Sequence, residues 1–199
     1  MGRTATLSDS HRTRSRGFSM VELAVSLTVM LILTAIAIPS LVRSFRTYQL
    51  NDAAARLSDQ LKFARFEAVR RNTPVSFLMR GGPDDWTVGT DSNNNGTLDS
   101  TEKQVIIAGF VTLLPSGAPP PSTSITATLG GSGTLTTKSG AVGAVTFDAR
   151  GAVSPLAVDV WYLGSTSNPE FGYRAVVLLP SGAVQIWTAP AGGTWQRIG

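Results

Sequence analysis

An uninterrupted apolar stretch near the start of the chain constrains the fold more than any other feature. It runs from Phe18 to Ile38, spans 21 residues, and has Glu22 as its only charged residue. As a helix this stretch is about 31 Å long, which matches the roughly 30 Å hydrocarbon core of a bilayer. A carboxylate inside a membrane costs about 2.5–3.5 kcal/mol on insertion scales and usually has a partner. The sequence therefore predicts a membrane-spanning helix in which Glu22 has a function.

The residues on either side of this stretch predict its orientation and its end. The leader, residues 1–17, holds four arginines and one aspartate, which predicts a cytoplasmic N-terminus and a C-terminal part on the other side of the membrane. Pro39 follows the stretch and lacks a backbone N–H, so we expect a kink there. Two alternatives stay open. One is a secretory signal peptide cleaved after Ala35–Ala37, and the other is a generic single-pass anchor in which Glu22 is incidental.

The junction Gly17-Phe18-Ser19-Met20-Val21-Glu22 resembles the type III signal of type IV pilins and type II secretion pseudopilins. In that family a prepilin peptidase cuts after the glycine and N-methylates the new N-terminal phenylalanine. The resemblance implies cleavage between Gly17 and Phe18, methylation of Phe18, and a role for Glu22 in assembly through the N-terminal amine of a neighbouring subunit. Pro39 stands where the family has a proline that marks a similar bend.

Beyond Pro39 the pattern becomes amphipathic. Small and apolar residues recur every three or four positions, which predicts one buried stripe on a helix that continues to about residue 72: Leu50, Ala54, Leu57, Leu61, Ala64 and Ala68. Asn72 and Pro74 supply the stop signal. Polar and basic residues occupy the other faces and are expected to be a solvated surface: Arg46, Asn51, Arg56, Lys62, Arg65 and Arg70.

After Pro74 the helical period disappears and β-branched and aromatic residues recur in short runs. Six strands are predicted between clusters of Gly, Pro, Asn and Ser: Val75–Arg80, Asp85–Thr90, Lys103–Phe110, Ala157–Leu163, Tyr173–Leu179 and Val184–Thr188. Pro115–Ser124 reads as a proline-rich connection, and Leu129–Gly143 as a mobile loop or weak hairpin. The predicted fold class is α+β, with a long N-terminal helix packed on antiparallel sheet.

The C-terminal half narrows the family resemblance. The segment Phe147-Asp-Ala-Arg-Gly-Ala-Val153 is similar to a Phe-x-x-x-Gly-x-Val pattern of GspH/FimT-type minor pseudopilins. The segment Trp86 to Val105 and the late strand–Ser-Gly–strand ending, Val176 to Trp187, resemble that group as well. Some DNA-binding FimT-like members carry Gly-Arg-x-Arg after the late strand, whereas this chain has Gly182-Ala183-Val184-Gln185. The resemblance implies a pilin-like fold, and the missing arginines make nucleic acid an unexpected partner.

A twelve-residue segment matches the EF-hand loop pattern in full. Oxygen ligands for calcium would come from six positions, with Thr97 contributing its carbonyl: Asp91, Asn93, Asn95, Thr97, Asp99 and Glu102. Gly96 would permit the sharp turn. Strand-like residues flank the loop, where an EF-hand has helices, so two interpretations remain: a weak calcium site, or a polar hairpin loop that needs no metal.

The distribution of charge and the missing residue types exclude several classes of function. The chain has a net charge of +4, but residues 72–199 hold six basic and eight acidic side chains, which disfavours a nucleic-acid surface in that part. It has no cysteine, and its one histidine is His11 in the leader. Cysteine nucleophiles, histidine-based triads and most zinc sites are therefore excluded from the processed chain. A Ser–Lys or paired-carboxylate enzyme stays open, but no motif marks one, and we expect no enzyme.

The combined expectation is a structural subunit in four parts. These are a cleaved leader (1–17), the membrane half of a helix (18–39), its amphipathic half (40–72) and a β-rich periplasmic domain (73–199). As the resemblance implies, the chain would be a minor pseudopilin of a type II secretion system, held in the inner membrane and then assembled into the pseudopilus. Its partners would be the prepilin peptidase and other pseudopilin or pilin subunits. The alternative is a minor type IV pilin for pilus assembly or DNA uptake.

Overall fold

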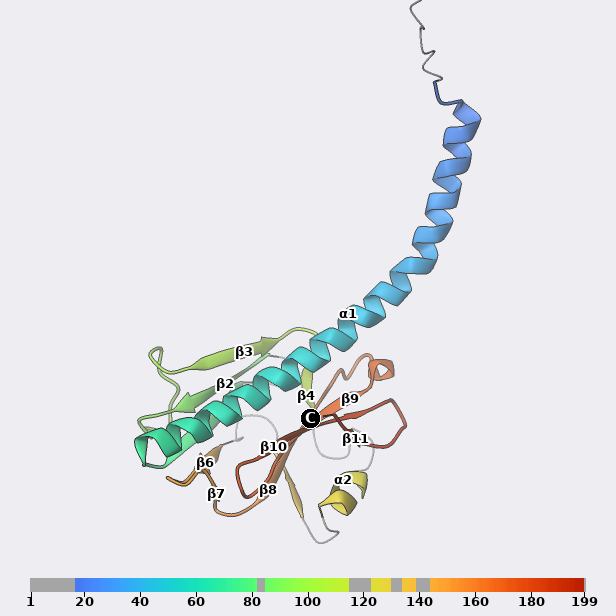
Figure 1. The fold of residues 1–199 in the computed structure, drawn as a ribbon. Helices are drawn as coiled ribbons and strands as arrows, with labels where there is room; N and C mark the ends of the chain where they lie inside the picture. The colour runs from blue at the N-terminus through green and yellow to red at the C-terminus, as the bar shows by residue number, and fades with distance from the viewer. Residues whose placement is uncertain (1–16, 82–84, 115–122, 130–133, 139–143, 199) are drawn as a thin grey trace, which may run out of the picture. The chain divides into compact units, whose positions relative to one another are not determined.

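One helix dominates the N-terminal part of the molecule. The computed structural model describes residues 17–81, 85–114, 123–129, 134–138 and 144–198 (Figure 1). The helix, α1, runs without a break from Met20 to Arg71 and includes Pro39. The chain divides into two compact units, residues 1–41 and 42–199, and α1 contributes to both. The bend expected at Pro39 stays a prediction, because the helix is continuous there.

The C-terminal end of α1 follows from the residues that succeed it. Asn72 adopts a left-handed conformation with φ of 53°, which asparagine tolerates better than most residues. The N–H of Thr73 donates to the carbonyl of Ala68, and the N–H of Asn72 donates to the carbonyl of Val69, both at 3.3 Å. These two bonds form a Schellman motif, and Pro74 prevents further helix. The predicted stop is confirmed.

The second half of α1 buries the stripe that its spacing predicts. All six predicted positions, from Leu50 to Ala68, have no exposed surface. Ala53 joins them at 3% exposed. The small alanines let the helix backbone approach the strands, while the leucines fill the space between them.

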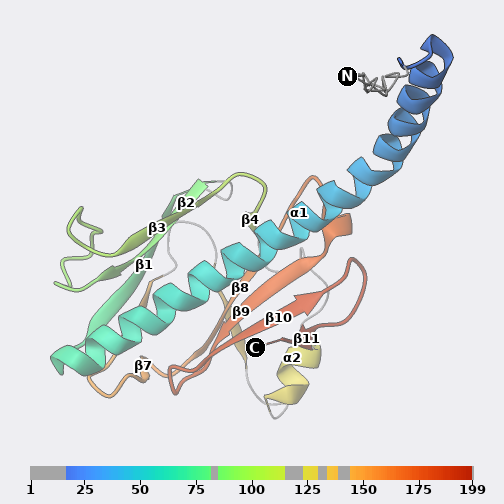
Figure 2. The same cartoon turned by 45° about the horizontal axis from the view of Figure 1, so that its top comes forward.

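Two sheets lie beneath this part of α1, one on each side of it in Figure 2. The first sheet is antiparallel throughout and has the order β3-β2-β1-β6-β7. Its strands are β1 (Val75–Gly81), β2 (Asp85–Asp91), β3 (Gln104–Ala108), β6 (Val145–Phe147) and β7 (Val153–Ser154). The pairing of β1 with β6 joins residues about seventy positions apart, such as Val75 and Phe147.

The second sheet has the order β11-β10-β9-β8-β4, with β5 paired to β8 in parallel. Its strands are β4 (Thr112–Leu114), β5 (Leu135–Thr137), β8 (Val158–Gly164), β9 (Tyr173–Leu178), β10 (Val184–Ala189) and β11 (Gln196–Arg197). The strands β4 and β5 share one edge of β8. The strand β4 pairs with the C-terminal residues of β8, and β5 pairs with the N-terminal residues of β8.

The two faces of the second sheet are both buried, so β8 and β9 are nearly continuous apolar runs. Trp161 and Val176 belong to the core under α1, where the ring of Trp161 packs edge-on against Phe77 at 5.9 Å between centroids. Val160 and Val177 belong to a second core on the other face. Ile125 of the short helix α2 (Thr123–Thr128) is fully buried in that second core, with Trp187 and Trp195.

All six predicted strands are confirmed within one or two residues at each end, and the α+β class is confirmed. Two expectations were incomplete. The described part of Leu129–Gly143 is no hairpin, because its strand β5 pairs with β8. Of the predicted connection Pro115–Ser124, only residues 123 and 124 are described, and they begin α2. The strands β6, β7 and β11 were not predicted, since each has only two or three residues.

Candidate functional site

The residues of the predicted cleavage junction lie at the start of α1. Gly17 and Phe18 precede the helix, and Glu22 stands in its first turn, where the unpaired backbone N–H groups favour a carboxylate. The side chains of Phe18 and Glu22 are both exposed. Residues 1–16 of the predicted leader lie outside the described residues. Among the described residues, therefore, the candidate junction and the Glu22 carboxylate are both exposed.

The first half of α1 is exposed and strongly apolar. An eighteen-residue window of the helix has a mean hydropathy of 2.4 and is not buried at all. Large apolar side chains such as Leu31, Leu33 and Ile36 keep more than 60% of their surface exposed. By length and composition this helix can cross a membrane, where hydrocarbon replaces the water that such a surface disfavours.

The segment 91–102 connects β2 to β3 and folds back on itself. Asp91 ends β2 with 1% of its surface exposed. Its Oδ1 accepts the N–H of Asn95 at 3.2 Å, and its Oδ2 accepts the N–H of Gly96 at 2.8 Å. Gly96 has φ of +76°, so the sharp turn uses the conformation that glycine adopts without strain. The flanking elements are strands, as the sequence indicated.

Two further carboxylates close the loop. Glu102 accepts the N–H of Ser92 at 2.7 Å with Oε1 and the N–H of Asp99 at 3.1 Å with Oε2. Asp99 in turn accepts the side-chain amides of Asn93 and Asn95 at 3.0 and 2.9 Å. These bonds, that from Asn93 first, lower the pKa of the Asp99 carboxyl because they favour its charged form.

The predicted ligand positions therefore gather in one loop. Thr97 joins them through its N–H and Oγ1, which both donate to Asn95 Oδ1 at 2.8 Å. Three of the six positions are carboxylates, two are side-chain amides and one is a backbone carbonyl. Among the described residues no three His, Cys, Asp or Glu side chains form a group that could hold a metal. Any cation here would depend on Asn93, Asn95 and the backbone as well as on the acids.

The Phe-x-x-x-Gly-x-Val segment forms a tight corner against α1. Phe147 and Val153 face each other across β6 and β7 and are buried in the core. Between them the Asp148 carboxylate accepts the N–H groups of Arg150 and Ala152 at 2.9 Å each. Gly151 has φ of +80°, and a Cβ there would lie 3.0 Å from Arg65 and Val69 of the helix. Packing therefore explains the Phe-x-x-x-Gly-x-Val pattern: Phe147 and Val153 fill the core, and the close approach of α1 favours glycine at position 151.

The turn before β10 completes this corner. The N–H of Val153 donates to the carbonyl of Pro180 at 2.9 Å, which links the two sheets. Gly182 has φ of +78°, and a Cβ there would overlap the carbonyl oxygen of Gly151. The half-buried Arg65 side chain lies against both glycines. Arg65 is therefore a packing residue, which corrects the expectation that it belongs to a purely solvated face.

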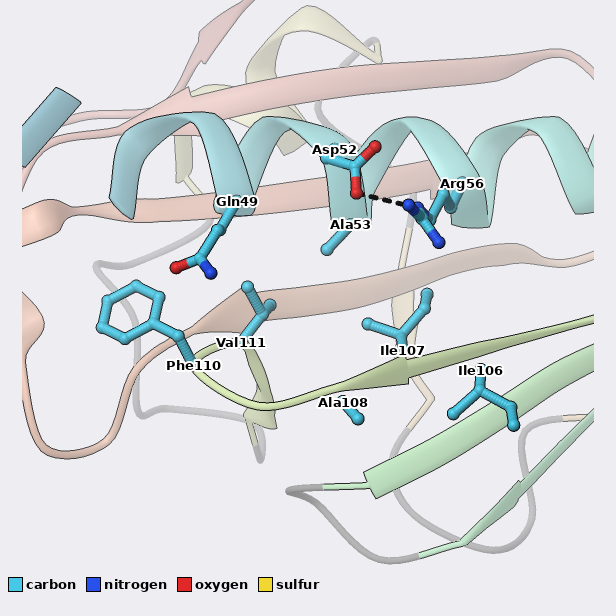
Figure 3. Close-up of a pocket in the computed structure, with 9 residues that line it drawn as sticks. All are labelled: Gln49, Asp52, Ala53, Arg56, Ile106, Ile107, Ala108, Phe110 and Val111. Carbon is cyan, nitrogen blue, oxygen red and sulfur yellow. Dashed lines mark ion pairs between the residues drawn. The ribbon is translucent and has the colours of Figure 1, made fainter. Parts of the chain in front are cut away.

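A shallow groove of about 170 Å³ separates α1 from the edge strand β3 (Figure 3). An ion pair between Asp52 and Arg56, 2.7 Å from Nε to Oδ2, lies on its helix side. Ile107 and Val111 line the opposite side. Near one end, the Arg46 guanidinium stacks on the Phe110 ring at 4.5 Å, so Arg46 too departs from the expected solvated face.

One charged residue that the sequence did not single out as a site is Arg174. It lies on β9 with 6% of its surface exposed and donates to the side chain of Asn51 on α1. A signal was present, because an arginine interrupts the otherwise apolar run Tyr173–Leu178 near its start. Its partner could not be anticipated, since Asn51 is 123 positions away in the chain.

Two family models match the chain. The family described as type II transport protein GspH matches residues 53–197, and the prokaryotic N-terminal methylation motif matches residues 12–38. No curated protein matches the chain.

The fold is shared with a solved minor pilin. A crystal structure of the type IV minor pilin FimU from Pseudomonas aeruginosa is 18% identical, with a TM-score of 0.50. The match covers 76% of this chain and 93% of that one. The minor pseudopilin EpsH of the type 2 secretion system of Vibrio cholerae is 12% identical, with a TM-score of 0.39 over 75% of this chain and 96% of that one. Since the family match spans most of the chain, this protein belongs to the GspH family of minor pilin-like subunits.

Proposed function

We propose that this chain is a minor pseudopilin of a type II secretion system. The GspH match over residues 53–197, joined to a methylation motif on an exposed apolar helix, carries this proposal. A prepilin peptidase cuts after Gly17 and methylates Phe18. The first half of α1 then holds the subunit in the inner membrane, with residues 73–199 in the periplasm, until α1 packs with the helices of other subunits in the pseudopilus.

Glu22 has a defined task in this proposal. A carboxylate exposed on an apolar helix is costly in hydrocarbon and tolerable when it is paired. The methylated amine of Phe18 on a neighbouring subunit would supply that pair and fix the register between helices. Pro39 would let α1 bend where it leaves the membrane.

The test is the variant Glu22→Ala in the native cells. We expect membrane insertion and cleavage to continue, with mass spectrometry showing a mature chain that begins at methylated Phe18, while incorporation into pseudopili falls. Ser26→Ala, one turn further along the same helix, is the control and should assemble normally. Normal assembly of Glu22→Ala would refute the role of Glu22, and a mature chain that begins beyond Ala37 would refute the cleavage site.

A minor type IV pilin is the second candidate, because FimU shares the fold. Deletion of the gene distinguishes the two functions. Loss of an exported protein from the medium, with surface pili intact, supports the secretion system. Loss of pili with normal secretion supports the alternative. A neighbouring gene for a retraction ATPase would favour the pilus, and genes for a secretion ATPase and a secretin would favour the proposed system.

We also propose that the segment 91–102 binds calcium. The observation that supports it is that Asp91 and Glu102, the first and last positions of the pattern, both accept backbone N–H groups of the same loop. Asp91, Asn93, Asn95, the Thr97 carbonyl, Asp99 and Glu102 would supply the oxygens. A site of this kind outside the cell binds weakly, with a Kd on the order of 10⁻⁴–10⁻³ M.

Calorimetric titration of the detergent-solubilised chain with calcium chloride tests the site. We expect saturable heat in the millimolar range that Asp99→Asn weakens by about tenfold or more, because it removes one of three carboxylates. Asp59→Asn on the exposed face of α1 is the matched control and should bind like the unchanged protein. Absence of heat at millimolar calcium would contradict the proposal.

A further inference from the structure

Arg174 is a buried cation held by neutral groups. Its side chain extends from β9 toward α1, and only 6% of the residue is exposed. Nε donates to Asn51 Oδ1 at 2.7 Å, and Nη1 donates to the carbonyl of Tyr173 at 2.8 Å. Burial lowers the pKa of the guanidinium, and no charge offsets that effect among the described residues. The arginine therefore carries the cost of desolvation without an ionic partner in that part of the chain.

The described residues contain five side-chain ion pairs, and Arg174 belongs to none of them. Its two hydrogen bonds leave the Nη2 group without an acceptor among the same residues. Two other strongly buried charges are ion-paired, whereas the carboxylate of Asp91 is held by backbone N–H groups. Glu67 is paired with two arginines, and Asp159 lies 3.4 Å from Lys138. A buried guanidinium normally has a carboxylate, because the planar fork matches that group in two parallel bonds.

The arginine lies beneath a part of α1 that is open to a partner. Asn51, its acceptor, is exposed, and Tyr48 one turn earlier keeps 66% of its surface exposed. Ala55, one turn later, is exposed as well. These residues form a helix face that the described strands do not cover.

We propose that Arg174 is half of an intermolecular ion pair, completed by an Asp or Glu carboxylate of a neighbouring pilin-type subunit. This inference rests on the proposed function, since it needs a filament in which another subunit lies against this face of α1. The buried guanidinium supplies the specificity, because a subunit without a carboxylate at that position leaves the cation unpaired. Asn51 positions the guanidinium for its partner.

Zero-length cross-linking identifies the partner directly. Arg174→Lys keeps the charge and introduces an amine, which a carbodiimide joins to a carboxylate in contact with it, while the arginine of the unchanged protein does not react. In membranes from the native cells we expect a cross-linked peptide in which the new amine at position 174 is joined to an Asp or Glu of another pilin-type subunit. Linkage only to carboxylates of the same chain, or no linkage in a variant that still assembles, overturns the proposal.

Asn51→Asp separates this role from a purely structural one. The new carboxylate would pair with Arg174 inside the subunit, so the melting temperature should rise. If the neighbour's carboxylate is needed, co-purification with other pilin-type subunits should fall on the order of tenfold or more. Ala127→Glu adds the same charge on the exposed side of α2, which packs on the other face of the second sheet, and should leave co-purification unchanged. A rise in melting temperature with unaltered co-purification of Asn51→Asp refutes the intermolecular pair.

The two proposals fail in different ways. If the unchanged protein co-purifies with no other pilin-type subunit, the filament function itself is wrong. Suppose instead that the unchanged protein co-purifies normally, that Arg174→Lys forms no link to another subunit, and that Asn51→Asp changes only the melting temperature. The filament function then stands and the ion pair is wrong.

Discussion

At the scale of single residues, the end of α1 depends on one buried acid. The Glu67 carboxylate accepts Nε and Nη2 of Arg70 at 3.0 and 2.7 Å and Nε of Arg71 at 2.8 Å. Arg71 also donates Nη1 to the carbonyl of Ser92 in the loop 91–102. The bond with Arg70, more than any other contact, lowers the pKa of Glu67, although burial opposes it. Glu67 thus connects the last turn of the helix to the candidate calcium loop.

Glu67→Gln should therefore lower the free energy of unfolding by roughly 1–2 kcal/mol at neutral pH, since both arginines are partly solvated. The pKa of Glu67 is lower in the folded chain than in the unfolded chain. Its contribution is therefore present above the unfolded pKa, near 4.3, and is lost as pH falls through the folded value. Urea unfolding followed by tryptophan fluorescence at pH 7 and at pH 3 measures the difference, which should shrink at the lower pH.

Asp59→Asn is the control for this prediction, because Asp59 is 73% exposed and lies 3.8 Å from Lys62. It should change stability little at either pH. An equal loss in both variants would show that the burial of Glu67 is unimportant.

At the scale of elements, the corner between Gly151 and Gly182 joins α1 to both sheets. The motif around Gly151 is visible in the sequence because its residues are contiguous. The structure explains both glycines by close contacts that a Cβ would make with Arg65, Val69 or the Gly151 carbonyl. The buried stripe of α1 was predictable for the same reason, since its residues recur at regular spacing along one helix. The strand–loop–strand arrangement around residues 91–102 was predictable as well, because its pattern lies within one short segment.

Elements defined by distant partners could not be predicted in this way. The strand β5 is a Leu-Thr-Thr triplet in a region rich in Gly, Ser and Thr, and only its pairing with Val158–Val160 makes it a strand. The strand β11 is shorter still, with two residues. Arg174 and Asn51 form their bond across 123 positions, so no local signal could unite them.

Gly182→Ala should destabilise the fold by about 2–4 kcal/mol, because alanine disfavours the left-handed backbone at this position and its methyl group would overlap the Gly151 carbonyl. Gly192→Ala is the matched control. Gly192 has φ of +70° with nothing within 4 Å of a Cβ, so only the conformational cost of about 1 kcal/mol applies. Thermal unfolding of the two variants compares them, and equal losses would mean that the contact at the corner yields easily.

At the scale of the whole molecule, α1 makes the two sheets one cooperative body. Leu57 is fully buried in a core that also contains Phe77 from β1 and Trp161 from β8. Contacts of this kind couple the stability of both sheets to one helix.

Leu57→Ala should cost about 2–5 kcal/mol, as for other large cavities in cores. Hydrogen exchange followed by mass spectrometry should show the amides of β2 and β9 accelerating together. Acceleration of β2 with β9 unaffected would show that the sheets unfold independently.

The pairing of β1 with β6 and the position of Val176 under α1 impose an order on folding. The stripe of α1 is synthesised first, yet its cover is complete only when Val176 and Leu178, more than a hundred residues later, have emerged. Contacts of such sequence separation form slowly. During synthesis, the buried leucines and alanines of α1 therefore stay uncovered until β9 has been made. A chaperone that shields an amphipathic helix is consequently most needed before β9 arrives, and a chain truncated ahead of β9 is a natural substrate for proteolysis.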